Sequence, residues 1–249
     1  MMIVEGRNPV YEIITTNASS VLKVIIKNGI EPKWKNKLIK IAKSKNIPIE
    51  IVESSVIDKI SNTDKNQGVI VKMKDFVYSE HEDIIQRAKK LNTYPLFVLL
   101  DGIQDPHNLG SIIRTACAAG ASGIVIPKRR ACQVNSTVIK TSAGTVFKIP
   151  ILRVSNINNY IDKLKQSGVF CFGLDMNGEN IYNTDFDKSV ALVIGSEGDG
   201  ISRLTKQKCD GLVSIPIDGS VESLNAGVAS GISIFEVIRQ RKIKGGYHD

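Results

Sequence analysis

Six short apolar runs, most of them separated by helix-like segments, fill the chain from residue 94 onward. In order they are PLFVLL, SGIVIP, VFKIPIL, GVFCFGL, SVALVIG and GLVSIPI. A strand that is covered on both faces carries apolar side chains at every position, so continuous runs of this length are typical of parallel strands that lie between helices. The pattern predicts an α/β domain with a parallel sheet over residues 94–249.

The first 75 residues predict a second, smaller α/β module. VLKVIIK is expected to be a strand that ends in a turn at Asn28–Gly29, and KWKNKLIKIAKSKNI a helix that ends near Asn46. PIEIVE and QGVIVKMK supply two more strands. Residues 76–93 mix charges with a short helical period, and we expect them to form a linker or a bridging helix between residues 1–75 and 94–249.

The whole chain has a net charge of +8, and its excess of basic residues is concentrated in the smaller part. Residues 1–75 hold 13 Lys and Arg against 8 Asp and Glu, whereas residues 76–249 hold 20 against 17. The excess favours a polyanionic partner such as RNA or DNA, although a basic enzyme without such a partner would show it too. The lysines of the expected helix form either a solvated face or a phosphate-contacting surface: Lys35, Lys37, Lys40, Lys43 and Lys45.

The sequence offers little for metal binding, disulfides or membrane insertion. None of its four cysteines stands in a C-x-x-C pair, and only three histidines accompany them, so we expect neither a metal site nor a disulfide framework. No apolar run approaches about 18 residues, and no basic segment followed by an apolar one opens the chain. These features predict no membrane span, no signal peptide and a reducing, cytoplasmic compartment.

A first polar loop, DPHNLGSIIRTA, follows the strand PLFVLL. Proline restricts the residue before it to extended conformations, so Asp105–Pro106 predicts a turn, and Asn108 is a suitable N-cap for the next helix. Gly110 leaves room for a close approach. Arg114 lies among apolar residues on this helix, and a buried guanidinium needs either an acidic partner or an anionic ligand. The loop alone does not separate these two explanations.

A second loop, ALVIGSEGDGIS, carries three glycines after an apolar strand, which lets backbone amides face a ligand. Their order, Gly195, Gly198 and Gly200, is not the G-x-G-x-x-G of dinucleotide-binding folds, although Asp218 has a spacing comparable to the ribose-binding acid of such folds. Glu197 would repel a pyrophosphate and suits a cationic partner better. We expect that partner to be Arg114.

A third loop, IPIDGSVESLNAGVASGISIFEVI, precedes a helix that begins with small residues. Ser223 is expected to cap this helix, and Gly227 and Gly231 imply a close approach by a backbone or a ligand, because each glycine costs about 1 kcal/mol in a helix interior. Ser223 and Asn225 offer a hydroxyl and an amide near the helix start. Close packing alone would explain most of this pattern. A further small and polar stretch, KTSAGTVFKIP, is either an ordinary turn or a source of backbone contacts to the site.

Together, the three loops resemble the three motifs of the SpoU (TrmH) family of RNA ribose methyltransferases, which belongs to the SPOUT class. The motifs correspond to LDGIQDPHNLGSIIRTA, LVIGSEGDGIS and IPIDGSVESLNAGVASGI, and they occur in the family's order over residues 96–240. The N-terminal part resembles the family's ribosomal-protein-like substrate-binding domain, where NQGVIV replaces a segment that begins with HQGV.

The resemblance implies a fold and an activity. The fold is an α/β domain with a C-terminal trefoil knot that binds S-adenosylmethionine, in a homodimer whose active site is completed across the interface. The activity moves a methyl group from S-adenosylmethionine to a ribose 2′-hydroxyl of RNA. Chain length and the N-terminal domain are similar to those of enzymes that methylate a guanosine in 23S ribosomal RNA. A tRNA methyltransferase of the same family is the nearest alternative, a non-catalytic RNA-binding or ribosome-assembly factor another, and a nicotinamide-dependent oxidoreductase a distant third.

The resemblance also assigns roles to individual residues. The expected catalytic residues are Asn108, Arg114, Glu197, Ser223 and Asn225. The expected cofactor contacts are Gly195, Ile215, Leu224 and Asn225, together with Ser142, Ala143 and Gly144 of the small and polar stretch. No metal ligand is expected.

Overall fold

The computed structural model describes residues 1–61, 66–91, 93–219 and 221–244, and it divides into two compact units. Met1–Val77 and Val134–Lys148 form the first unit, and Tyr78–Gln133 and Ile149–Asp249 form the second. Asn92 of the expected linker and Ser220 of the third motif lie outside the described residues.

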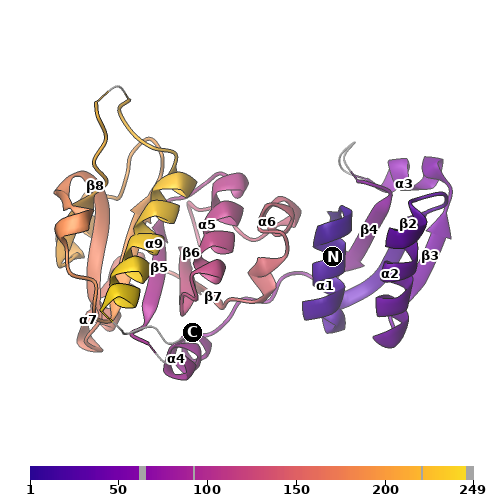
Figure 1. Cartoon of the computed structure of the whole chain (residues 1–249), viewed down its shortest axis with the longest axis horizontal. Helices are drawn as coiled ribbons and strands as arrows, with labels where there is room; N and C mark the ends of the chain where they lie inside the picture. Colours follow the sequence, from indigo (N-terminus) through magenta and orange to yellow (C-terminus); the bar gives the residue numbers. More distant parts are fainter. Residues whose placement is uncertain (62–65, 92, 220, 245–249) are drawn as a thin grey trace. The chain divides into compact units, whose positions relative to one another are not determined.

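The first unit contains a four-stranded sheet of order β1-β4-β2-β3, drawn in indigo and purple in Figure 1. Only β2 and β3 run parallel. Its elements are β1 (Met2–Glu5), α1 (Arg7–Thr16), the 3-10 helix η1 (Ala18–Ser20), β2 (Val21–Lys27), α2 (Pro32–Ser44), β3 (Ile49–Val52), α3 (Ser54–Ile60) and β4 (Val69–Met73). The three strands and the helix predicted within residues 21–74 are all present. Part of the core lies between α3 and the sheet, where Ile57 packs with Ile25 and Ile70.

The segment 134–148 belongs to the first unit by its contacts, although its place in the sequence lies within the range 94–249 expected for the larger domain. It consists of α6 (Ser136–Thr141) and the 3-10 helix η2 (Thr145–Phe147), and α6 packs along β1. Lys148 forms an ion pair with Glu12 of α1, and Gly144 lies so close to Glu12 that a Cβ at Gly144 would stand 2.6 Å from its Cγ. These contacts explain why the segment groups with α1 and β1.

The second unit is built on a six-stranded sheet of order β10-β8-β9-β5-β6-β7 in which every pair is parallel. The strands are β5 (Leu96–Asp101), β6 (Gly123–Pro127), β7 (Ile151–Val154), β8 (Phe170–Asn180), β9 (Val190–Gly195) and β10 (Gly211–Ser214). Each of the six apolar runs supplies one of them, so the expected parallel sheet is confirmed. Five α-helices and a 3-10 helix accompany the sheet in the described residues: α4 (His81–Lys90), α5 (Pro106–Ala118), α7 (Ile157–Gln166), η3 (Ile181–Asn183), α8 (Arg203–Lys208) and α9 (Ala226–Ile243).

Helices cover both faces of this sheet, as the continuous apolar runs require. Phe97 and Leu99 of β5 point to one face, where α4 and α7 supply Ile84 and Ile161 to the same core. Alternate residues of β5 therefore point to the other face, which α5 and α9 cover, and Figure 1 shows these two helices side by side. The α4 helix lies within the expected linker 76–93, yet its buried Ile84 makes it part of this core.

The observed fold is a mixed α/β architecture with a parallel sheet, as predicted. The trefoil knot stays a prediction. Among the described residues, no helix is both long and apolar enough to cross a membrane.

Candidate active site

The first two motif loops meet at the carboxyl ends of neighbouring strands. Asp101, the last residue of β5, pairs in register with Gly195, the last residue of β9. The Asp101 carboxylate then accepts a hydrogen bond from the backbone N–H of Ser202 at 2.9 Å, which ties the loop after β9 to the end of β5. This edge of a parallel sheet is where open α/β folds bind ligands.

Asn225 joins residues from all three motifs. Its side-chain oxygen caps α9 by accepting from the backbone N–H groups of Gly227 at 3.0 Å and Val228 at 3.2 Å. Its side-chain nitrogen donates to Asn108 Oδ1 at 2.9 Å and to Glu197 Oε1. One amide thus fixes the start of a helix and holds two predicted site residues, which are separated from it by 117 and 28 positions in the chain.

Glu197 is paired differently from the expectation. Its carboxylate accepts from Asn225 and from the backbone N–H of Ala226 at 3.3 Å, at the N-terminus of α9, and it forms no ion pair with Arg114. The first N–H groups of a helix have no partner within the helix, and the macrodipole places partial positive charge there, so this end attracts a carboxylate. The expected Glu197–Arg114 pair was therefore wrong.

Arg114 was expected to be buried, but it is exposed. Within the described ranges it has no hydrogen-bond or ion-pair partner. The apolar residues of α5 that point inward are Leu109, Ile112, Ile113 and Ala116. Arg114 lies off this stripe, three positions after Ser111, which packs close to Gly227 of α9. Its guanidinium is consequently available to a ligand in the chain as it stands.

Two expected helix caps are also corrected. The N-cap of α5 is Asp105, whose carboxylate accepts from the His107 N–H at 3.0 Å, with Pro106 as the first helical residue. Asn108 lies inside the first turn, is buried, and directs its amide to Asn225. The N-cap of α9 is Asn225 and not Ser223.

A cavity of about 440 Å³ opens beside these loops. Its lining includes five of the predicted site residues, namely Gly195, Glu197, Ile215, Ser223 and Leu224. Asn108, Arg114 and Asn225 do not line it, and Ser142, Ala143 and Gly144 lie in the first unit, so their expected contact with the cofactor stays a prediction.

Part of the cavity wall comes from residues that the sequence reasoning did not name. They are Leu174–Asn177 of β8 and Lys206 of α8. The available signal was the continuation of the GVFCFGL run into the polar residues DMNGEN, at the end of a strand where ligands bind. The apolar run predicts the strand, but it does not indicate that the polar residues that follow it line the cavity.

Two of the residues that line the cavity form an ion pair. Lys206 contacts the carboxylate of Asp175, which is 9% exposed. Burial by itself raises the pKa of Asp175, but the hydrogen bond and charge of Lys206 and the Asn177 backbone N–H, which donates at 3.0 Å, outweigh it and lower this pKa. Asp175 therefore stays ionised at neutral pH.

The glycine loop is closed on itself too tightly for any other residue at position 195. The N–H groups of Ser196 and Gly200 donate to each other's carbonyl oxygens, at 3.2 and 3.0 Å. A Cβ on Gly195 would stand 1.9 Å from the carbonyl carbon of Gly200, far inside contact distance. The side-chain-free position is what lets this turn form one wall of the cavity.

Two family models match the chain in its two parts. The model of the SpoU rRNA methylase family matches residues 95–235. The model described as RNA 2′-O ribose methyltransferase substrate binding matches residues 3–79. The chain belongs to the SpoU rRNA methylase family.

Individual relatives agree with this assignment. A protein of Bacillus subtilis assigned to the TrmH family of tRNA/rRNA methyltransferases is 40% identical over 241 residues, and one of Staphylococcus epidermidis is 39% identical over 241; each match covers 96% of both chains. The SpoU methyltransferase AviRb of Streptomyces viridochromogenes, solved with S-adenosylmethionine, superimposes with a TM-score of 0.79 at 25% identity and covers 97% of this chain and 90% of its own. The protein is an S-adenosylmethionine-dependent RNA methyltransferase of the SpoU (TrmH) family.

The cavity beside the glycine loop fits S-adenosylmethionine. Its volume lies in the range of small-molecule sites, and its apolar residues, Leu174, Ile194, Val213, Ile215 and Leu224, suit an adenine ring. The carboxylates of Glu197 and Glu222, which are among its lining residues, complement a positively charged sulfur. In the part of the chain that the structure describes, no group of His, Cys, Asp and Glu is arranged to hold a metal.

Proposed function

We propose that this SpoU-family protein methylates the ribose 2′-hydroxyl of a guanosine in 23S ribosomal RNA. The observation that carries the proposal is the hydrogen-bonded set of Asn108, Glu197 and Asn225 beside the cavity, together with the guanidinium of Arg114, which has no partner among the described residues. The substrate-binding model that matches residues 3–79 supports the ribose 2′-oxygen as the acceptor. The names of the relatives include both tRNA and rRNA, so the 23S target rests on the resemblance of the N-terminal part.

The reaction needs a ribose oxygen with its proton removed close to the methyl group. When bound, S-adenosylmethionine supplies a methyl group on a positively charged sulfur and leaves as a neutral thioether, so no acid is required for the leaving group. Gly195, Ile215 and Leu224 would hold the cofactor at the glycine loop, and Glu197 and Ser223 line the same cavity. Bringing the methyl carbon and the ribose oxygen to about 3 Å supplies much of the rate acceleration.

Arg114 is the residue that grips the RNA next to the reacting oxygen. Arginine keeps its proton, so it does not serve as a base. Its planar fork instead binds the phosphate beside the target ribose and stabilises the negative charge that develops on the 2′-oxygen. A phosphate oxygen or a water accepts the proton, while Asn108, Glu197 and Asn225 keep the nucleotide and the start of α9 in place.

The active form is a homodimer, with α9 in the interface. Three apolar residues on this helix are exposed in the single chain: Val228 at 51%, Phe235 at 48% and Ile243 at 71%. Exposed apolar residues on a helix next to the site fit a second copy of the chain. We expect Phe235→Asp to sediment as a monomer and to lose methyl transfer; a dimeric variant with full activity would exclude α9 from the interface.

The function is tested with labelled S-adenosylmethionine and total RNA from a strain that lacks this protein, followed by mapping of the methylated nucleotide. We expect label on one guanosine 2′-oxygen of 23S RNA. Label in tRNA would replace the ribosomal target, and no label in any RNA would favour a non-catalytic RNA-binding or ribosome-assembly factor. A cytoplasmic enzyme that acts on ribosomal RNA also fits a sequence whose four cysteines form no C-x-x-C pair.

The catalytic role of Arg114 is tested by two substitutions. Arg114→Ala should abolish methyl transfer while the affinity for S-adenosylmethionine, measured by calorimetry, changes little, because Arg114 does not line the cavity. Arg114→Lys should also be poor, since lysine lacks the planar fork. Near-normal turnover in the alanine variant would remove Arg114 from the mechanism.

A further inference from the structure

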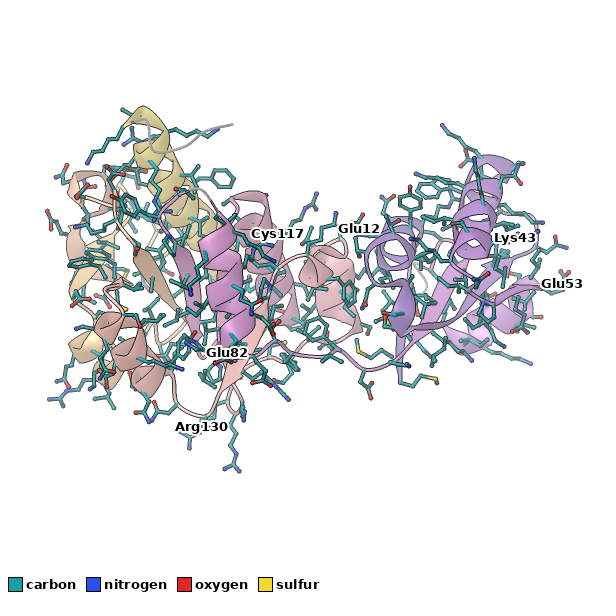
Figure 2. All side chains as sticks on the ribbon, turned by 90° about the horizontal axis from the view of Figure 1, so that it is seen from below. Glu12, Lys43, Glu53, Glu82, Cys117 and Arg130 are labelled. Atoms are coloured by element: carbon teal, nitrogen blue, oxygen red, sulfur yellow. The ribbon has the colours of Figure 1, made fainter. Side chains whose placement is uncertain are left out.

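Three consecutive cations, Lys128, Arg129 and Arg130, follow β6 at the same edge of the sheet as the candidate active site. We refer to residues 128–130 as the basic loop. All three side chains are exposed, and Figure 2 shows Arg130 on a loop that projects from the ribbon. No described residue forms an ion pair or a hydrogen bond with any of their charged groups.

Several other cations of the second unit are in a different state. They are bound to a carboxylate of the same unit, and the pairs are Lys165–Asp210, Lys188–Asp185, Lys206–Asp175, Lys208–Asp162, Arg239–Glu236 and Lys244–Asp185. A cation that is already paired offers less to an incoming phosphate. The basic loop keeps its full charge for a ligand.

The backbone of the basic loop is held in one conformation. The side-chain nitrogen of Gln133 donates to the carbonyl oxygens of Pro127 at 3.0 Å and Ala131 at 3.1 Å, and the Lys128 N–H donates to Val154 O at 2.8 Å. Within this frame Arg130 has a φ of 56°, the left-handed region that glycine adopts without strain. An ordinary residue there costs about 1–2 kcal/mol, and the chain places a cation at this position.

The chain two residues after the basic loop is bonded to the first motif loop. The backbone N–H of Cys132 donates to the carbonyl oxygen of Ile103 at 2.7 Å. Ile103 lies between β5 and Asp105, the N-cap of the helix that carries Asn108 and Arg114. The three cations therefore lie one strand over from the network of Asn108, Glu197 and Asn225.

We infer that the basic loop binds consecutive phosphates of the RNA strand on one side of the target nucleotide. This inference rests on the proposed function, because it assigns the loop to the RNA of that same site. Fixed, unpaired cations next to the site contact the backbone of RNA without reading its bases, and they set the register of the strand. The phosphodiester backbone is the ligand, and the arginines bind it through paired N–H groups.

The test compares two triple variants that lose the same charge. One replaces Lys128, Arg129 and Arg130 by Gln, and the other replaces Lys89, Lys90 and Lys163, which are exposed on α4 and α7. The probe is a labelled single-stranded RNA of about 30 nucleotides and mixed sequence, whose Kd is measured at several salt concentrations. Each phosphate contact to a single strand contributes about 0.7 to the slope of log Kd against log salt.

We expect the basic-loop variant to lower this slope by about 2 and to bind RNA roughly ten-fold more weakly at low salt. The control variant should change the slope by less than about 0.7, the contribution of one phosphate contact. With total RNA as substrate, the KM of the basic-loop variant should rise while its kcat at saturating RNA is retained. If the wild-type protein methylates RNA and the basic-loop variant has the same slope and the same KM as wild type, the inference is overturned. Absence of methyl transfer by the wild-type protein would instead contradict the proposed function.

A single variant separates charge from backbone strain at Arg130. Arg130→Gly relieves the left-handed conformation, so thermal unfolding should occur at a higher temperature, yet it removes one phosphate contact and should lower the slope by about 0.7. A stabilised protein whose slope is unchanged would show that Arg130 does not contact RNA.

Discussion

Replacing Asn225 by Ser separates two jobs that one side chain performs. Serine caps a helix about as well as asparagine, so the bonds to Gly227 and Val228 keep an acceptor. The amide donor is lost, and with it the bonds to Asn108 and Glu197. Asn225→Ala removes the cap as well and serves as the matched comparison.

The size of each effect follows from burial. Asn108 is buried, so its oxygen loses a neutral hydrogen bond that contributes about 1 kcal/mol to stability. Glu197 is exposed and keeps its bond to Ala226, so water replaces most of what it loses. We therefore expect Asn225→Ser to lower the free energy of unfolding by about 1 kcal/mol, and Asn225→Ala by about 2 kcal/mol, because the lost cap adds about 1 kcal/mol.

Activity should follow a different order. If Asn108 and Glu197 need Asn225 to orient the nucleotide, losing both bonds costs about 2 kcal/mol in the transition state, a reduction of roughly 30-fold in kcat/KM. This reduction should be similar in the Ser and Ala variants although their stabilities differ. Urea unfolding gives the first quantity and labelled methyl transfer the second. A Ser variant with kcat/KM within about three-fold of wild type would refute the role of the network.

Three further predictions concern other positions. Arg241→Met should lower the free energy of unfolding by about 3–5 kcal/mol in a urea titration, because the buried guanidinium donates to the carbonyl oxygens of residues 94, 95, 186 and 188; a loss under about 1 kcal/mol would mean that water replaces it. Gly195→Ala should weaken S-adenosylmethionine binding at least roughly ten-fold by calorimetry, since its Cβ cannot fit against Gly200, and unchanged affinity would place the cofactor elsewhere. Burial, and then the charge of Lys163, lowers the pKa of His81 from its ordinary 6.5, so the unfolded chain binds more protons below that pH and stability should fall as pH drops through 6.5, then level off below the folded pKa. His81→Gln should remove this part of the pH dependence, and identical urea profiles for both proteins would contradict it.

The parallel sheet could be predicted because its physical requirement appears within each short segment of the sequence. Strands covered on both faces must be apolar throughout, and all six runs became strands. The shortest elements of the first unit gave weaker signals. MIVE is four residues long, and Pro9 interrupts the period of α1, so neither β1 nor α1 was expected.

The site was predictable at the level of loops and less so at the level of partners. DPHN offers two residues that can cap a helix, and the proline after Asp105 decides between them, because proline suits the first helical position. The exposure of Arg114 could have been read from the period of α5, since Leu109, Ile112, Ile113 and Ala116 define its buried stripe. The contact of Glu197 with the start of α9 depends on how the tertiary structure places that helix, and a local sequence pattern does not predict this.

Arg114 and the basic loop share a property that gives the two proposals a common physical basis. Each is a positive charge without a partner among the described residues, in a protein that pairs many of its other cations. An exposed guanidinium in water binds a phosphate weakly, because the interaction is screened, and it strengthens as the surroundings lose water. The exposed apolar residues of α9 lie on the helix that packs against α5, so a second chain bound there would dry the region next to Arg114. The basic loop lies at the opposite side of α5, where β6 ends, and would stay in water. We therefore expect the loop to set RNA affinity and its salt dependence, while Arg114 acts on the rate once the dimer and the RNA have enclosed it.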